Sequence, residues 1–153
     1  MNSANKLIKI AFDRISNKNK CKFGRFSYTI NCTFEGKNLI SSNTVLHNTC
    51  LGYGTYVGRN CELNGAIIGK YTCIGPRVIN VTGNHPTRQF VSIHPAFFSP
   101  QHEIGYSYVN SEKFEEYTFA DRNAHACIVI GNDVWIGANV IIIDCLLYTS
   151  RCV

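Results

Sequence analysis

The chain has 153 residues, a formal net charge of +5, and 45% hydrophobic against 16% charged residues. This length suits one domain with a buried core, and the apolar content excludes an intrinsically disordered chain. No apolar run approaches the roughly 18 residues of a membrane-spanning helix. The eight cysteines form no CxxC pair, and no apolar leader precedes them. We therefore expect a cytoplasmic protein with reduced thiols and no structural metal.

Basic residues are concentrated near the N-terminus. Residues 1–25 contain seven of the 15 lysines and arginines but a single acidic residue, Asp13. Residues 4–16 place apolar side chains on one side of a helix, with basic residues between them. We expect a helix that packs as a cap on the following fold, with peripheral membrane contact as the alternative. No base-stacking motif accompanies the basic residues, so we expect no nucleic acid partner. The apolar positions are Leu7, Ile8, Ala11, Phe12 and Ile15.

From residue 39 onward, apolar residues recur at a step of six. The step drops one residue before Ile68, and it returns at Ile130 after a long interruption. Glycine directly follows six of these ten positions, although the chain has only 12 glycines. Small or β-branched residues recur four places after them. The ten positions are Leu39, Val45, Leu51, Val57, Leu63, Ile68, Ile74, Ile130, Ile136 and Ile142.

A period of six fits neither a helix nor one long strand. It fits short strands joined by turns, in which each strand points the same residue toward a common core. Three such hexads make one triangular coil of about 18 residues, and successive coils stack at about 4.8 Å, the distance between hydrogen-bonded strands. Glycine after the inward residue allows the close backbone approach that each corner needs. The pattern therefore predicts an all-β fold, a parallel β-helix.

The repeat is interrupted between Ile79 and Ile128 by a long segment rich in aromatic residues. Loops of this length in a compact domain are functional or disordered, and the aromatic content argues for order. His85 lies where the loop begins, so its imidazole can project from a rigid edge of the coil. Histidine has an unperturbed pKa suited to proton transfer near neutral pH. Of the five histidines, His85 is therefore the candidate for catalysis, with a structural or solvent-exposed role as the alternative.

Two further motifs accompany the repeat Ile/Leu/Val-Gly-x-x-small-x. Residues 82–87 read Thr-Gly-Asn-His-Pro-Thr, and residues 91–99 read Val-Ser-Ile-His-Pro-Ala-Phe-Phe-Ser. Residues 130–140 read Ile-Gly-Asn-Asp-Val-Trp-Ile-Gly-Ala-Asn-Val. Together these segments resemble the hexapeptide-repeat acyltransferases. The likeness is to the branch that O-acetylates capsule and lipopolysaccharide sugars and is related to the xenobiotic acetyltransferases.

The resemblance implies a left-handed parallel β-helix and an acetyl-CoA-dependent O-acetyltransferase acting on a saccharide hydroxyl. His85 would be the general base, worth about 10²–10⁴ in rate, and Asn84 would contact the substrate. Trp135 and Gly137 would line the coenzyme site, and the backbone N–H of Ala138 would help to hold the thioester oxyanion. Acetyl-CoA is already activated, so direct transfer is expected, without an acyl-enzyme and without a metal. Family members are homotrimers.

The expected organisation has five parts. After residue 142 the next aliphatic and glycine pair should fall at 148–149, where the chain has Tyr148 and Thr149. We therefore interpret the last residues as a non-native or truncated tail, and whether a chain so truncated retains a donor site or activity stays open. The parts are a basic helical cap at 1–28, coils at 29–79, an inserted active-site loop at 80–127, a coil at 128–144 and the tail at 145–153.

Other functions stay open at this point. They are a streptogramin-type xenobiotic acetyltransferase, a sugar N-acetyltransferase and a non-catalytic β-helix scaffold. A γ-type carbonic anhydrase shares the fold but needs a His-x-x-x-x-His spacing that is absent from the chain. The motifs do not identify the acceptor sugar or the position that is acetylated.

Overall fold

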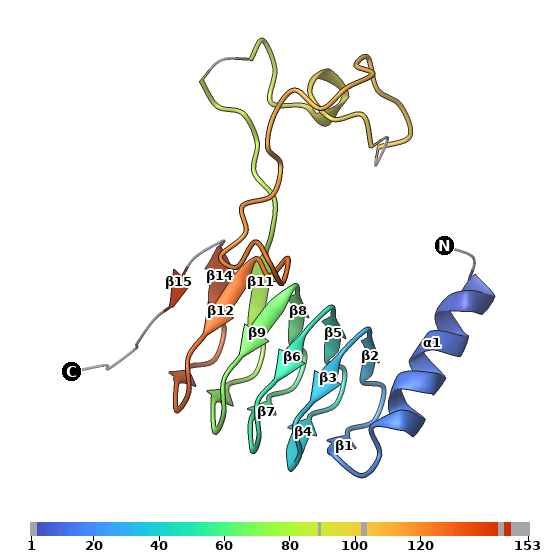
Figure 1. Ribbon diagram of the computed structural model, residues 1–153, viewed down its shortest axis with the longest axis vertical. Helices are drawn as coiled ribbons and strands as arrows, with labels where there is room; N and C mark the ends of the chain where they lie inside the picture. Colours follow the sequence, from blue (N-terminus) through green and yellow to red (C-terminus); the bar gives the residue numbers. More distant parts are fainter. Residues whose placement is uncertain (1–2, 89, 102–103, 144–145, 148–153) are drawn as a thin grey trace. The chain divides into compact units, whose positions relative to one another are not determined.

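A computed structural model describes residues 3–88, 90–101, 104–143 and 146–147 of the chain. Its strands form three sheets, every paired strand is parallel, and each sheet takes every third strand of the chain (Figure 1). The chain therefore winds through the three sheets in turn, which defines a parallel β-helix. The predicted all-β fold, with one N-terminal helix and a long inserted loop, is confirmed. Within the described residues no helix has both the length and the apolar character that crossing a bilayer requires.

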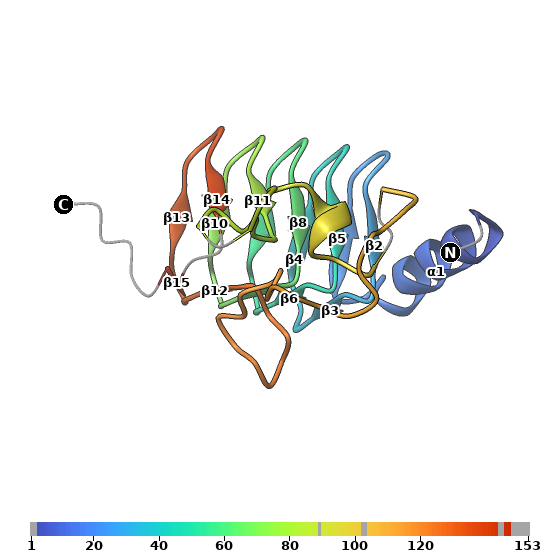
Figure 2. The same ribbon diagram turned by 90° about the horizontal axis from the view of Figure 1, so that it is seen from above.

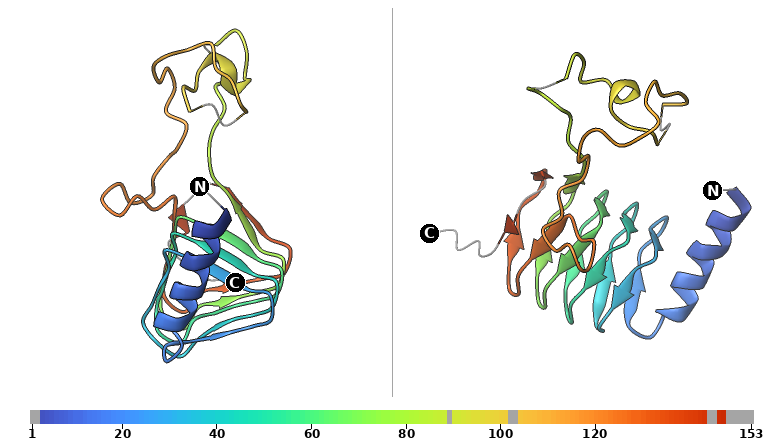
Figure 3. Two further views of the ribbon diagram at one scale, coloured as in Figure 1. Left: turned by 90° about the vertical axis from the view of Figure 1, so that its right-hand side faces the viewer. Right: turned by 45° about the horizontal axis from the view of Figure 1, so that its top comes forward.

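The chain divides into two compact units. The β-helix unit comprises Met1–Val81 and Phe119–Val153, and the loop unit comprises Thr82–Thr118. Figure 2 shows the coils of the β-helix unit side by side along its axis, and Figure 3 shows the three-sided cross-section with α1 (Ser3–Ser16) across one end.

Each sheet of the β-helix unit has five strands. The first sheet contains β1 (Cys21–Phe23), β4 (Asn38–Ile40), β7 (Tyr56–Val57), β10 (Cys73–Ile74) and β13 (Trp135–Ile136). The second contains β2 (Tyr28–Ile30), β5 (Val45–His47), β8 (Glu62–Asn64), β11 (Ile79–Val81) and β14 (Ile141–Ile143). The third contains β3 (Thr33–Phe34), β6 (Cys50–Leu51), β9 (Ala66–Ile68), β12 (Ile128–Ile130) and β15 (Leu146–Leu147).

One coil is 17 residues long, one fewer than the hexad pattern predicts. Tyr56 lies opposite Cys73 in the sheet, and the side chains of Asn31 and Asn48, 17 residues apart, are joined by a hydrogen bond of 3.2 Å. Each coil therefore takes two steps of six residues and one of five. The single-residue deletion that the sequence shows before Ile68 recurs in every coil.

The five-residue step corrects two predicted inward positions. Leu39 is 42% exposed and Val45 is half-buried, whereas the neighbouring Ile40 and Leu46 are fully buried. The prediction that these two residues point inward was wrong, because counting in steps of six gives a position one residue away from the true one on the other side of a five-residue step. The buried inward residues are Phe34, Ile40, Leu46, Leu51, Val57, Leu63, Ile68, Ile74, Ile130, Ile136 and Ile142.

The same step changes both ends of the repeat. Cys21 lies opposite Asn38, so the coil begins at Cys21 and not at residue 29. At the other end Leu147 lies opposite Ile130, so the parallel register continues into residues 145–153, where we expected it to fail. The rest of that segment, residue 145 and residues 148–153, lies outside the described residues.

Threonine satisfies the backbone at the turns between sheets. The buried hydroxyls of Thr44, Thr55 and Thr72 donate to a glycine carbonyl of the next coil at 2.6, 2.6 and 2.9 Å. Each hydroxyl oxygen also accepts a backbone N–H from that coil. An unsatisfied buried polar group costs about 1–3 kcal/mol. This exchange explains the threonine four places after Ile40, Leu51 and Ile68.

The loop unit has an aromatic core of its own. Phe98 is 1% exposed, and its ring centroid lies 6.2 Å from that of Phe90 and 5.6 Å from that of Phe114. The three rings meet edge to face, the arrangement that aromatic pairs prefer. The excursion from the coil is therefore organised around aromatic packing and not around the hexad.

Glycine at the corners allows the backbones of successive coils to approach closely. A Cβ on Gly58 would lie 2.6 Å from the carbonyl carbon of Gly75 in the next coil. A Cβ on Gly137, in the last corner of this series, would have none of the described residues within 4 Å. The glycine requirement therefore comes from stacking, and none of the described residues imposes it at Gly137.

Gly58→Ala is expected to lower the free energy of unfolding by about 1–3 kcal/mol, the cost of inserting a methyl group into packed structure. Gly137→Ala is the matched control and is expected to change it by at most about 0.5 kcal/mol. Urea denaturation followed by circular dichroism measures both. Equal losses in the two variants would contradict the stacking explanation.

Candidate functional site

His85 lies at the start of the loop unit, and its exposed ring is held from two sides. Nδ1 lies 2.8 Å from the backbone oxygen of Ile93, and the ring meets Phe98 edge-on with 5.9 Å between centroids. A carbonyl oxygen can only accept, so Nδ1 carries the proton and Nε2 of the neutral ring keeps its lone pair. An exposed imidazole in this tautomer can take a proton from a hydroxyl group.

The second histidine of the motif positions the first. Nδ1 of His94 accepts the N–H of Ala96 at 3.4 Å and so caps a 3-10 turn at Pro95–Phe97. The His94 ring stacks on Tyr106 with 6.2 Å between centroids. The residues that flank this turn both contact His85, Ile93 through its carbonyl oxygen and Phe98 through its ring. The structure thus gives His94 a local structural role.

Asn84 connects the two ends of the loop unit. Its backbone N–H donates to the carbonyl of Glu116 at 2.7 Å, and its side-chain Nδ2 donates to the hydroxyl of Thr118 at 2.9 Å. Gly83, which precedes it, has a φ of +101°, a conformation that favours glycine. The side-chain oxygen of Asn84 remains as an acceptor for a ligand hydroxyl.

A cavity of about 370 Å³ lies beside His85 in the loop unit. Its size is at the lower end of small-molecule sites. Phe90 and Phe114 supply apolar faces, and Arg88 supplies a cation. This combination suits a sugar, which has apolar ring faces and polar edges. The lining residues are Asn84, His85, Pro86, Thr87, Arg88, Phe90 and Phe114.

Trp135 lies on the outer face of the first sheet. It is 68% exposed on β13 and lies opposite Cys73, which in turn lies opposite Tyr56 of β7. A hydrogen bond with the Cys73 side chain raises the pKa of the Tyr56 phenol. Leu39 of β4 continues the same row. We call this apolar row, Leu39, Tyr56, Cys73 and Trp135, the outer column.

Gly137 and Ala138 form the corner that follows β13. Ala138 is exposed, and its N–H donates to none of the residues that the structure describes. A backbone donor of this kind can bind an oxyanion. Among the residues described, no side chain crowds the corner, because a Cβ built on Gly137 would meet none of them within 4 Å.

The predicted site residues fall into two sets. Asn84 and His85 belong to the loop unit, and Trp135, Gly137 and Ala138 belong to the β-helix unit. Sequence reasoning missed the carbonyl of Ile93, because a backbone group carries no residue-type signal. It also included Phe98 only within the motif at 91–99, without its contact to His85.

Cys21, Cys32 and Cys61 of the coil are buried, and their burial bears on nucleophilic chemistry. Burial raises the pKa of Cys21 to about 12 and that of Cys32 to about 11, and it also raises the pKa of Cys61. A thiol must ionise to act as a nucleophile, so these three are poor candidates. Among the residues described, no three His, Cys, Asp or Glu side chains gather where they could hold a metal ion.

Comparisons of the chain with protein-family models, with curated proteins and with solved structures find no match. The function is therefore inferred from the motifs and from the geometry around His85. Two features of that geometry matter most, the fixed tautomer of the imidazole and the cavity beside it.

Buried Cys21 and Cys32 are expected to react with iodoacetamide much more slowly than exposed Cys50 at pH 8.5, because their raised pKa values keep the thiols protonated. In the unfolded chain these thiols ionise near their ordinary pKa of about 8.5. The unfolded state therefore binds fewer protons than the folded state between about pH 9 and 11, and the free energy of unfolding falls as the pH rises through this range.

Mass spectrometry of the alkylated peptides measures the order of reaction, and urea denaturation at several pH values measures the stability. Early modification of Cys21 in the folded protein would contradict its burial.

Proposed function

We propose that this protein is a hexapeptide-repeat acyltransferase that transfers an acetyl group from acetyl-CoA to a saccharide hydroxyl. His85 is the general base. The observation that supports this best is the 2.8 Å contact between Nδ1 of His85 and the carbonyl oxygen of Ile93, because it leaves Nε2 as the proton acceptor.

In the proposed reaction, Nε2 of His85 removes the proton of the acceptor hydroxyl as that oxygen bonds to the thioester carbonyl carbon. The tetrahedral oxyanion then collapses, the carbon–sulfur bond breaks, and the departing sulfur takes the proton from Nε2. The carbonyl of Ile93 accepts a hydrogen bond from Nδ1–H throughout and stabilises the transient imidazolium. No enzyme nucleophile is needed, consistent with the raised pKa of the buried thiols.

The proposed acceptor site is the cavity beside His85. Phe90 and Phe114 would stack on the apolar face of a sugar ring, and Arg88 would bind its polar edge. The Nδ2 of Asn84 donates to Thr118, and its side-chain oxygen accepts no hydrogen bond from the described residues, so it can accept one from a substrate hydroxyl. Substrate contact by Asn84 thus remains part of the proposal.

The proposed donor site lies on the β-helix unit. Trp135 offers an exposed indole for the pantetheine arm, and the N–H of Ala138 offers a donor to the oxyanion, worth about 3 kcal/mol in the transition state. The family resemblance places base and coenzyme on neighbouring copies of a homotrimer. The outer column gives a flat apolar row against which a second copy or the coenzyme can pack.

His85→Ala is expected to lower the rate of acetyl transfer by about 10²–10⁴-fold, the contribution of a general base. Coenzyme A binding should be unchanged, because His85 acts on the acceptor. Mass spectrometry of a saccharide panel incubated with acetyl-CoA measures transfer. Because Trp135 is the only tryptophan, its fluorescence reports coenzyme binding separately.

His125→Asn is the matched control, because His125 is exposed in a turn with a φ of +50° that asparagine also adopts. Its turnover is expected to equal that of the unsubstituted protein. Undiminished transfer by His85→Ala would refute the proposed base. A Trp135 fluorescence that does not respond to coenzyme A would refute the proposed donor site.

A further inference from the structure

α1 is attached to the β-helix unit by polar groups. The carboxylate of Asp13 accepts the N–H of Cys32 at 3.3 Å. The guanidinium of Arg14 donates to the carbonyl of Gly24 at 3.2 Å and lies 5.4 Å from the centroid of the Phe23 ring. These contacts fix which side of the helix faces the coil.

This attachment turns the apolar side of α1 outward. We expected that side to pack on the first coil, but its residues are about two-thirds exposed, whereas Ile10 and Asp13 are half-buried. The prediction was wrong because amphipathicity shows which face is apolar and not which face is covered. We call the exposed residues the apolar stripe: Leu7, Ile8, Phe12 and Ile15, with exposures of 66%, 67%, 67% and 66%.

A lysine-rich pocket of about 400 Å³ begins directly after α1. We call it the lysine pocket. Its floor includes the buried Cys21 and Asn38, and the Asn38 amide is fixed by hydrogen bonds to two backbone carbonyls at 2.8 and 3.1 Å. Within the described residues, none of its lysines has a carboxylate partner. The four cations are Lys18, Lys20, Lys22 and Lys37.

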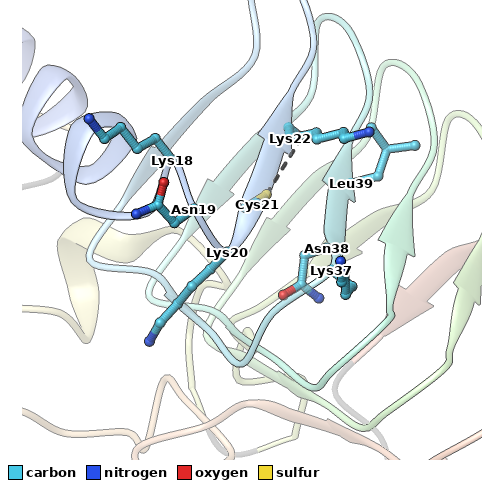
Figure 4. A pocket seen from close by; sticks show the side chains of 8 residues that line it. All are labelled: Lys18, Asn19, Lys20, Cys21, Lys22, Lys37, Asn38 and Leu39. Atoms are coloured by element: carbon cyan, nitrogen blue, oxygen red, sulfur yellow. Dashed lines mark hydrogen bonds between the residues drawn. The ribbon is translucent and has the colours of Figure 1, made fainter.

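The lysines are spread out and do not converge on one point. Figure 4 shows Lys18 beside the end of α1, with Lys20 and Lys22 extending from the following segment in different directions. A single small anion would need convergent donors, whereas a surface that carries many phosphate groups can contact each lysine separately. Nearby, Phe26 is 70% exposed, and the guanidinium of Arg25 lies 4.8 Å from its ring centroid.

We propose that the apolar stripe and the lysine pocket form a docking surface for an anionic phospholipid membrane. The stripe enters the boundary between headgroups and acyl chains, and the lysines bind the lipid phosphates. A helix with one apolar face flanked by cations is typical of interfacial membrane binding. The four lysines and the apolar stripe include none of the residues proposed for acetyl transfer, although Leu39 of the outer column also lines the lysine pocket.

The positive charge of this surface favours an anionic membrane over a second copy of the chain as its binding partner. Residues 1–25 carry seven basic residues against one acidic residue. Two copies that met through this segment would bring like charges together, which opposes association. An anionic bilayer complements the same charges and also accepts the apolar side chains.

The test is co-sedimentation of the whole 153-residue chain with vesicles of phosphatidylcholine, alone or mixed with phosphatidylglycerol. The chain is expected to bind the mixed vesicles at least about 10-fold more tightly, and binding should weaken as salt is raised. Lys18→Gln/Lys20→Gln/Lys22→Gln should lower partitioning by about 100-fold, since each cation contributes roughly fivefold. Ile8→Ser/Phe12→Ser should lower it by a similar factor.

Matched controls remove the same groups from other parts of the surface. Arg59→Gln/Lys70→Gln/Lys113→Gln takes away three exposed cations. Val91→Ser/Ile141→Ser takes away two exposed apolar side chains, which are 105% and 59% exposed. Both controls should bind the mixed vesicles as the unsubstituted chain does. Because every substituted side chain is exposed, circular dichroism should show unchanged folding in all four variants.

Three outcomes would overturn the proposal. The first is equal binding to neutral and anionic vesicles, or to neither. The second is binding that survives both the lysine and the stripe substitutions. The third combines two results. Light scattering gives a lower molar mass for Ile8→Ser/Phe12→Ser than for the unsubstituted chain, and the unsubstituted chain does not bind vesicles. That combination would assign the apolar stripe to contact with a second copy.

Discussion

The stacking of one coil directly on the next, backbone against backbone, is the constraint on which this structure depends. This stacking sets a repeat of 17 residues. It requires glycine where the backbones of two coils approach closely, and it places a threonine hydroxyl where a backbone carbonyl needs a hydrogen-bond donor. The buried inward residues of the coils fill the space that this stacking encloses. Outward residues are free of these demands, so they are the positions that can carry function.

The excursion leaves the coil without disturbing it. Cys73 still lies opposite Trp135, and Ile79 lies opposite Ile141, as if the intervening loop unit were absent. The loop unit is ordered by its own aromatic core around Phe98, which also holds the edge of the His85 ring. Regular coils therefore supply the framework, and an independent aromatic cluster supplies the precise placement of the proposed base.

The sequence predicts the parts of this fold that are periodic, because each coil repeats one physical demand. The aliphatic, glycine and threonine positions follow from it. Counting in steps of six wrongly predicted that Leu39 and Val45 point inward. The sequence pattern reveals the five-residue step only before Ile68, although the structure has one such step in every coil. The direction of the apolar stripe was not predictable, since it depends on contacts of Asp13 and Arg14 that no local pattern encodes. For the site, the motif identified His85 but not the backbone carbonyl that fixes its tautomer.

The proposed chemistry depends on that tautomer more than on any other feature. Long-range ¹H–¹⁵N correlation spectra of protein with labelled histidines distinguish the two ring nitrogens, and the His85→Gln variant assigns the signal. At a pH where the ring is neutral, His85 should carry its proton on Nδ1 and show an unprotonated Nε2. A spectrum with the proton on Nε2 would contradict the role of the Ile93 carbonyl and, with it, the proposed general base.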